Sequence, residues 1–96
     1  MTMTAKLELT ARYIPHPEVI ESRLGEETVM LHLGKAVYFG LDATGTIVWE
    51  RLRHGDTPEA IFAYLRSAFS DAPVCVEADV TTFLTELLQK DLIRAA

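Results

Sequence analysis

The sequence contains one cysteine, Cys75, among 96 residues. A lone cysteine excludes an intramolecular disulfide and a metal site built from several thiolates. No apolar run approaches the roughly 20 residues that a membrane-spanning helix needs. The first dozen residues also lack the apolar core and the cleavage pattern of a secretory signal. We therefore expect a cytoplasmic protein.

Basic residues are the scarcer charged type, with 9 Lys and Arg against 14 Asp and Glu and a net charge of −5. An acidic chain releases no counterions at a phosphate backbone, and an anionic membrane surface repels it. The sequence therefore predicts neither nucleic acid nor membrane as a partner. Hydrophobic residues make up 49% and charged residues 24%, which is typical of a globular fold. The length suits a single domain.

The first part of the chain has strand-like patterns. Residues 18–24, 27–33 and 36–39 alternate or favour a pleated surface, and Gly25-Glu26 and Gly34-Lys35 separate them as tight turns. The sequence therefore predicts a three-stranded antiparallel meander. Before it, residues 1–13 are expected to form a flexible arm, in which a short strand from about residue 7 remains open. Two prolines then hold residues 14–17 extended.

The second part of the chain has helical patterns. Asp42 is expected to cap a first helix, and Thr57-Pro58 to begin a second. A third helix is predicted from about Val76 to Lys90, because its apolar residues recur at helical spacing. Gly45 is interpreted as a small residue against which another element packs closely. The predicted fold is α+β, with a winged helix-turn-helix-like arrangement of the meander and three α-helices in one domain, residues 14–96.

No residue pattern supports catalysis or metal binding. His16, His32 and His54 are never three or four residues from one another or from Cys75, so they form no local ligand motif. We interpret them as surface or capping histidines and Cys75 as a half-buried apolar residue. Nucleophile elbows, phosphate-binding loops and dinucleotide-binding glycine patterns are absent from the sequence. We therefore predict no catalytic residues, no metal, no cofactor and no enzymatic activity.

The last strand of the predicted meander is more informative. Proteins usually protect the outer edge of a sheet with charge or proline. The first strand of the meander follows that rule through Pro17, Glu18, Glu21 and Arg23, whereas residues 36–39 are all uncharged. Such an edge is covered by the chain's own arm, pairs with a second copy, or accepts a guest peptide as an added strand. The residues alone leave these alternatives open.

The third helix is a candidate for the other wall of a peptide groove. Asp79 and Phe83 border one side of its apolar face, and Leu84 and Leu88 the other. In the alternative interpretation, the whole face is core. A rival function, DNA reading by this helix in a winged-helix regulator, is disfavoured because acidic residues outnumber basic ones there.

Several short motifs occur in a characteristic order. They are His16-Pro17-Glu18, residues 38–42 (Tyr-Phe-Gly-Leu-Asp), Gly45, residues 47–50 (Ile-Val-Trp-Glu) and residues 78–87 (Ala-Asp-Val-Thr-Thr-Phe-Leu-Thr-Glu-Leu). In these motifs the chain resembles the PqqD family of peptide-binding proteins over nearly its whole length after Tyr13. It departs from the family in a shorter turn at residues 33–36 and in Lys90-Asp91-Leu92, where Lys-Gly-Leu is usual.

The resemblance implies a non-catalytic protein that recognises the leader of a ribosomally made precursor peptide. The leader would add as a strand beside the third strand and pack on the third helix. The partner enzyme would be a leader protease in lasso-peptide biosynthesis, which the Tyr38–Asp42 segment favours, or a radical S-adenosylmethionine enzyme in pyrroloquinoline quinone biosynthesis. A homodimer through the same edge remains an alternative. The expected peptide-binding residues are Ala36, Val37, Tyr38, Phe39, Asp79, Val80, Phe83, Leu84 and Leu87.

Overall fold

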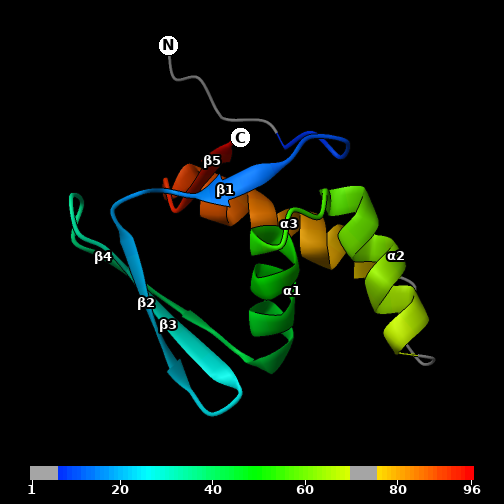
Figure 1. Ribbon diagram of the computed structural model, residues 1–96, viewed down its shortest axis with the longest axis horizontal. Helices are drawn as coiled ribbons and strands as arrows, with labels where there is room; N and C mark the ends of the chain where they lie inside the picture. The colour runs from blue at the N-terminus through cyan, green and yellow to red at the C-terminus, as the bar shows by residue number, and fades with distance from the viewer. Residues whose placement is uncertain (1–6, 70–75) are drawn as a thin grey trace.

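The computed structural model describes residues 7–69 and 76–96. Strands come first, three helices follow, and a last strand closes the chain (Figure 1). The elements are β1 (Tyr13–Pro15), β2 (Val19–Leu24), β3 (Glu27–His32), β4 (Val37–Leu41), α1 (Ala43–Arg53), α2 (Pro58–Ala68), α3 (Val76–Gln89) and β5 (Ile93–Ala95). The α+β fold predicted from the sequence is confirmed.

The predicted meander is the larger of two sheets. Its strand order is β2-β3-β4, and both pairings are antiparallel. The central strand sets the register, because Met30 lies opposite Glu21 on β2 and Phe39 on β4. Gly25 in the first turn has a φ of 65°, which a residue without a Cβ adopts at no steric cost. The third strand spans Val37–Leu41, slightly later than the predicted residues 36–39.

A second, two-stranded sheet joins the two ends of the chain. β1 pairs antiparallel with β5, so that Ile14 lies opposite Arg94 (Figure 1). The first strand therefore begins only at Tyr13, and residues 7–12 form no strand. Those residues are held by other contacts. The carbonyl of Leu9 accepts a hydrogen bond from the amide of Glu59, at the start of α2, at 3.1 Å. The division into an arm and a domain after residue 13 stays a prediction, although Tyr13 is buried in the core.

The helix starts match the capping signals. The Asp42 side chain accepts a hydrogen bond from the Gly45 amide at 2.7 Å, and that of Thr57 accepts one from the Ala60 amide at 3.1 Å. Each bond satisfies an amide that has no partner within its helix. α3 ends at Gln89, one residue before the predicted end. Residues 70–75, which include Cys75, lie outside the described residues.

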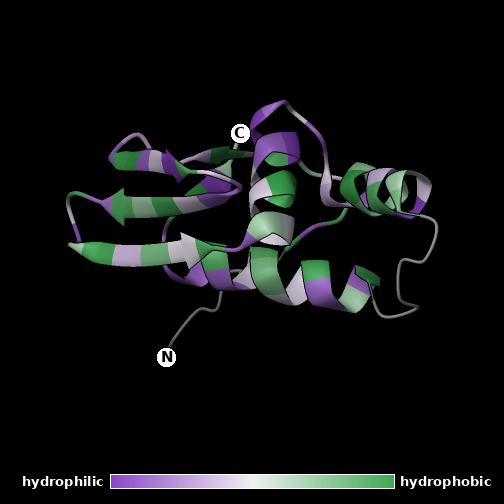
Figure 2. Ribbon diagram, turned by 90° about the horizontal axis from the view of Figure 1, so that it is seen from below, coloured by the Kyte–Doolittle hydropathy of each residue, from purple (hydrophilic) through white to green (hydrophobic). Residues whose placement is uncertain are grey.

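The core is centred on α1, which lies between the larger sheet and α2, with α3 across one side (Figures 1 and 2). Trp49 is 1% exposed, and its indole N–H donates to the Glu21 carboxylate. The inner face of β3 carries Thr28, Met30 and His32, all buried. The Thr28 and Thr46 hydroxyls hydrogen-bond each other at 3.0 Å inside this core. No helix in the described part of the chain is long and apolar enough to cross a bilayer.

Candidate functional site

The two outer edges of the larger sheet differ in their protection. β2 carries Glu21 and Arg23, which reach across to α1 and form ion pairs with Arg53 and Glu50. Charged residues of this kind discourage another strand from pairing with an edge. β4 contains no charged residue, and among the described residues it pairs with β3 alone. Within the described residues, the outer edge of β4 therefore has neither charge nor a partner strand.

A groove of about 580 Å³ runs beside this edge. β4 and the start of α1 form one wall, and α3 forms the other. Most of the side chains in it are apolar. The lining residues are Phe39, Gly40, Leu41, Asp42, Thr44, Gly45, Val48, Leu65, Val76, Asp79, Val80 and Phe83.

Gly45 is buried at the start of α1, where that helix meets α3. A Cβ atom at this position would lie 3.2 Å from Oδ1 of Asp42 and 3.5 Å from Cζ of Phe83. The first distance is tighter than most real Cβ contacts, and the Asp42 oxygen is held in place by its capping bond. Phe83 from α3 therefore packs on Gly45 at an ordinary contact distance, and the tight contact is with the Asp42 cap of the same helix. The Asp42 cap starts α1 immediately after β4. The edge strand and the first turn of α1 therefore form one continuous wall of the groove.

Aromatic and charged groups line the groove in order. The Phe39 ring from β4 and the Phe83 ring from α3 lie 6.3 Å apart between centroids, at 44°. The Lys90 ammonium, just after α3, lies 5.9 Å from the centroid of Phe39. Asp42 at the start of α1 and Asp79 in the first turn of α3 line the groove. The groove is thus apolar along its walls and acidic near the starts of α1 and α3, while Lys90 places a basic group beside Phe39 without lining the groove. Such a surface suits an extended peptide with bulky apolar side chains.

The structure brings only some of the predicted peptide-binding residues to this groove. Phe39, Asp79, Val80 and Phe83 line it. Leu84 and Leu87 are fully buried in the core, and they support α3 from beneath without lining the groove.

The remaining predicted residues lie near the start of β4. Ala36 is in the preceding turn, and Val37 is half-buried on the inner face. Tyr38 is 73% exposed and points to the opposite face of the sheet, because side chains alternate along a strand. These three residues bring backbone groups to the edge and no side chain to the groove lining.

Sequence reasoning missed several lining residues. Asp42, Thr44 and Val48 come from the first turns of α1, and the Asp42 capping signal already indicated that this helix starts beside the edge strand. Gly40 and Leu41 extend β4 beyond the predicted strand. Leu65 arrives from α2, and no local pattern indicates that it would meet the other two helices here.

Four polar side chains meet at the C-terminal end of α3. His16 and His32, which are distant in sequence, both face Asp91, with Nε2 to Oδ2 distances of 3.7 Å and 3.5 Å. Lys35 Nζ lies 3.3 Å from the same oxygen. Burial raises the pKa of Asp91, but the hydrogen bond and charge of Lys35, with the two histidines, outweigh it and lower the pKa below its ordinary value. Of the histidines interpreted as surface or capping residues, His32 is buried, although it does accept a backbone hydrogen bond.

Comparison with known proteins agrees with this architecture. Residues 27–93 match the family model of coenzyme PQQ synthesis protein D (PqqD). A solved structure of TbiB1 in complex with the TbiA(beta) leader peptide shares 34% sequence identity with this chain; the match covers 84% of this chain and 94% of that one, with a TM-score of 0.77.

A second solved structure, lasso peptide synthetase B1 complexed with the leader peptide, shares 21% identity; the match covers 88% of this chain and 99% of that one, also with a TM-score of 0.77. This second likeness concerns the fold alone. No sequence among curated proteins matches the chain significantly. Because the family model spans well over half of the residues, the resemblance seen in the sequence is confirmed, and the chain belongs to the PqqD family.

Proposed function

We propose that this chain binds the leader segment of a ribosomally synthesised precursor peptide and therefore acts as a RiPP recognition element. The observation that carries the proposal is the outer edge of β4, which is uncharged, has no partner strand among the described residues and lies beside an apolar groove. Family membership supports it, and so does the leader peptide bound to TbiB1, which is 34% identical to this chain.

The leader would join the sheet as a strand next to β4. Neighbouring strands lie about 4.8 Å apart, so its backbone would take up the outward-facing amides and carbonyls of β4. Alternate leader side chains would then point toward Val80 and Phe83 in the groove. Ordering a disordered leader costs chain entropy, which the backbone bonds and the buried apolar side chains must offset. Submicromolar binding requires a net free energy of roughly 8–9 kcal/mol.

The chain would present the captured precursor to a partner enzyme and would not itself catalyse a reaction. Holding the precursor raises its effective concentration at the enzyme. We favour a leader protease of lasso-peptide biosynthesis as the partner, on the basis of the Tyr38–Asp42 segment. The description of the family favours the second candidate, a radical S-adenosylmethionine enzyme of pyrroloquinoline quinone or related biosynthesis. Both partners, like a cytoplasmic location, remain predictions.

The test of binding is a fluorescence anisotropy titration. The probe is a fluorescein-labelled synthetic leader of the precursor peptide encoded beside the gene of this chain. We expect saturable binding, with slower amide hydrogen exchange along Val37–Leu41 in the complex. Binding that protects the outer edge of β2 would contradict the strand-addition model, as would the absence of binding.

The partner is identified by a second experiment. The purified leader protease or radical enzyme from the same gene neighbourhood is passed over the immobilised complex of this chain and the leader. Retention of the protease supports the lasso assignment, and retention of the radical enzyme supports the quinone-type assignment. Salt-sensitive binding to duplex DNA would instead favour the regulator alternative, which the acidic side chains Glu77, Asp79 and Glu86 on α3 disfavour.

A further inference from the structure

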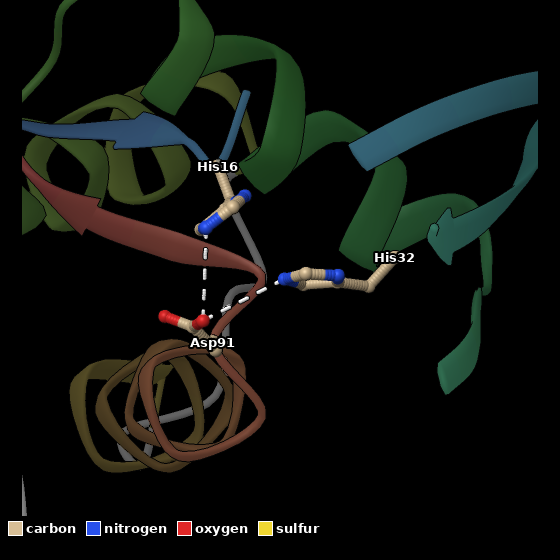
Figure 3. Close-up of side chains that lie close together, drawn as sticks. All are labelled: His16, His32 and Asp91. Carbon is tan, nitrogen blue, oxygen red and sulfur yellow. Dashed lines mark ion pairs between the residues drawn. The ribbon is translucent and has the colours of Figure 1, made fainter. Parts of the chain in front are cut away.

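Three cationic or polar side chains converge on one carboxylate oxygen at the end of α3. His16 comes from the link between β1 and β2, His32 ends β3, and Lys35 lies in the β3–β4 turn. All three face Oδ2 of Asp91, at 3.3 to 3.7 Å. Figure 3 shows the two imidazole rings directed at this carboxylate from different elements. We call these four residues the Asp91 clasp.

Asp91 occupies a position after α3 at which glycine is the usual residue. Asp91 has a φ of 60°, and its amide donates to the carbonyl of Leu88 at 3.0 Å, while the Leu92 amide donates to Leu87 at 2.9 Å. These bonds form a Schellman motif, in which glycine usually occupies the left-handed position because it has no Cβ. Aspartate adopts this conformation less readily than glycine, but unlike glycine it brings a carboxylate to the contacts described above.

The hydrogen bonds of the two histidines determine what that carboxylate meets. Nδ1 of His16 accepts from the Glu18 amide at 3.0 Å, and Nδ1 of His32 accepts from the Lys35 amide at 3.2 Å. A neutral imidazole that accepts at Nδ1 carries its hydrogen on Nε2. Both rings therefore direct an N–H toward Asp91. The His32 ring is 1% exposed, and among the described residues its Nε2 makes no hydrogen bond; the Asp91 carboxylate, 3.5 Å away, is the polar group that it faces.

The same hydrogen bonds disfavour a metal ion at this place. His16, His32 and Asp91 have the donor types and spacing of a metal site, and they form such a group within the described part of the chain. A metal, however, needs the lone pair of each Nε2, and a metal-bound imidazole normally donates a hydrogen bond from its other nitrogen. Here the other nitrogen accepts one. The Lys35 ammonium on the same oxygen further opposes a cation.

The clasp connects the turn before β4 to the end of α3. Lys35 is held twice, by its amide on His32 and by its ammonium on Asp91. Ala36, the next residue, has a φ of 54°, which non-glycine residues rarely adopt, and β4 starts immediately after it. Because β4 and α3 belong to opposite walls of the groove, the contact of Lys35 with Asp91 joins the turn that leads into one wall to the end of the other.

We propose that Asp91 is a positioning residue for leader binding, which fixes the β3–β4 turn on α3 and thereby holds β4 at the distance from α3 that an added strand requires. This inference rests on the proposed function. Asp91 itself does not line the groove, so its effect passes through Lys35 and the strand that follows.

The test compares Asp91→Gly and Asp91→Asn with wild type, using the labelled leader and thermal unfolding. Glycine suits the left-handed backbone, so the Asp91→Gly variant is expected to fold with equal or higher stability but to bind the leader about threefold to tenfold more weakly. Asparagine keeps an oxygen and tolerates the backbone, so its loss of affinity is expected to be smaller. The matched control is Asp56→Asn, which removes the ion pair with Arg51 far from the groove lining and should leave affinity unchanged.

A second readout does not need the leader. Nitrogen-15 NMR of the imidazoles is expected to show the Nε2–H form for His16 and His32 in wild type, and Asp91→Gly is expected to accelerate amide exchange at Lys35 and Val37. Unchanged affinity in Asp91→Gly would overturn the proposal, as would an affinity loss that merely parallels a loss of stability. Zinc binding by wild type that disappears in Asp91→Gly would replace the clasp with a metal centre. Failure of wild type itself to bind the leader would overturn the proposed function and, with it, this inference.

Discussion

At the scale of single residues, Phe83 is the aromatic side chain of α3 that lines the groove. Phe83 faces Phe39 across the groove, and its Cζ would lie 3.5 Å, an ordinary contact distance, from a Cβ atom at position 45. Its ring is half-buried in the free protein, which leaves surface available to a ligand. Anchoring aromatics in such partly open positions tend to contribute much of the binding energy of an interface.

Replacing Phe83 by alanine is therefore expected to weaken leader binding by about tenfold or more, since the apolar wall is lost. The measurement is the anisotropy titration. Phe69→Ala is the matched control, because Phe69 is exposed at the end of α2 and does not line the groove. Equal effects of the two substitutions would contradict the location of the binding site.

The buried pair of Thr28 and Thr46 gives a prediction about stability. Valine at either position leaves the other hydroxyl without its 3.0 Å partner inside the core, at a cost of about 1–3 kcal/mol in the free energy of unfolding. Valine at both positions removes the two polar groups together and is expected to cost less than the sum of the single variants. Urea unfolding measures all three, with the exposed Thr82→Val as control. Strict additivity would exclude the hydrogen bond as the cause.

The Asp91 carboxylate gives a prediction about pH. Because its pKa lies below the ordinary value in the folded protein, its contribution to stability is present above the unfolded-state pKa and is lost as pH falls through the folded-state pKa. Lys35 has the largest of the effects that lower this pKa, so Lys35→Gln is expected to raise the titration midpoint of the Asp91 carboxyl. Carbon-13 NMR titration of the Asp91 carboxyl measures this midpoint. An unchanged midpoint would show that Lys35 does not lower the pKa of Asp91.

Among the elements, helix starts were the most predictable from sequence and the terminal strands the least. A cap is a local signal: Asp42 and Thr57 stand three residues before the amides they bind. The pairing of β1 with β5 joins the two ends of the chain, and residues 7–13 alternate as if they were a strand, although the structure turns them away before Tyr13. Local periodicity cannot report a partner that lies most of the sequence away.

Loss of the Asp42 cap is expected to affect both stability and binding, because the first turn of α1 also lines the groove. Asp42→Ala should cost about 1 kcal/mol and lower the melting temperature by about 4–8 °C. Thr57→Ala removes the corresponding cap from α2, away from the groove lining, so it should destabilise similarly and leave leader affinity unchanged. Calorimetry measures stability, and anisotropy measures leader affinity. Equal leader affinity in both variants would show that the Asp42 cap does not contribute to leader binding.

At the scale of the whole molecule, the sequence predicted the fold, the family and an uncharged edge strand, but only part of the groove. Phe39, Val80 and Phe83 were predictable because each lies on a periodic element. Leu65 and the Asp91 clasp were not, since each depends on elements that meet only after folding. Leu84 and Leu87 belong to the same apolar face as the lining residues, and only the packing of α3 distinguishes the buried side of that face from the open one.

The unequal protection of the two sheet edges bears on how the protein behaves in concentrated solution. Since the charges of β2 discourage pairing there, two copies that associate through their sheets would meet β4 to β4. Such a dimer and the leader would compete for one strip of backbone. Self-association would then act as a reversible inhibitor, so that apparent leader affinity declines as protein concentration rises and added leader dissociates the dimer in sedimentation experiments.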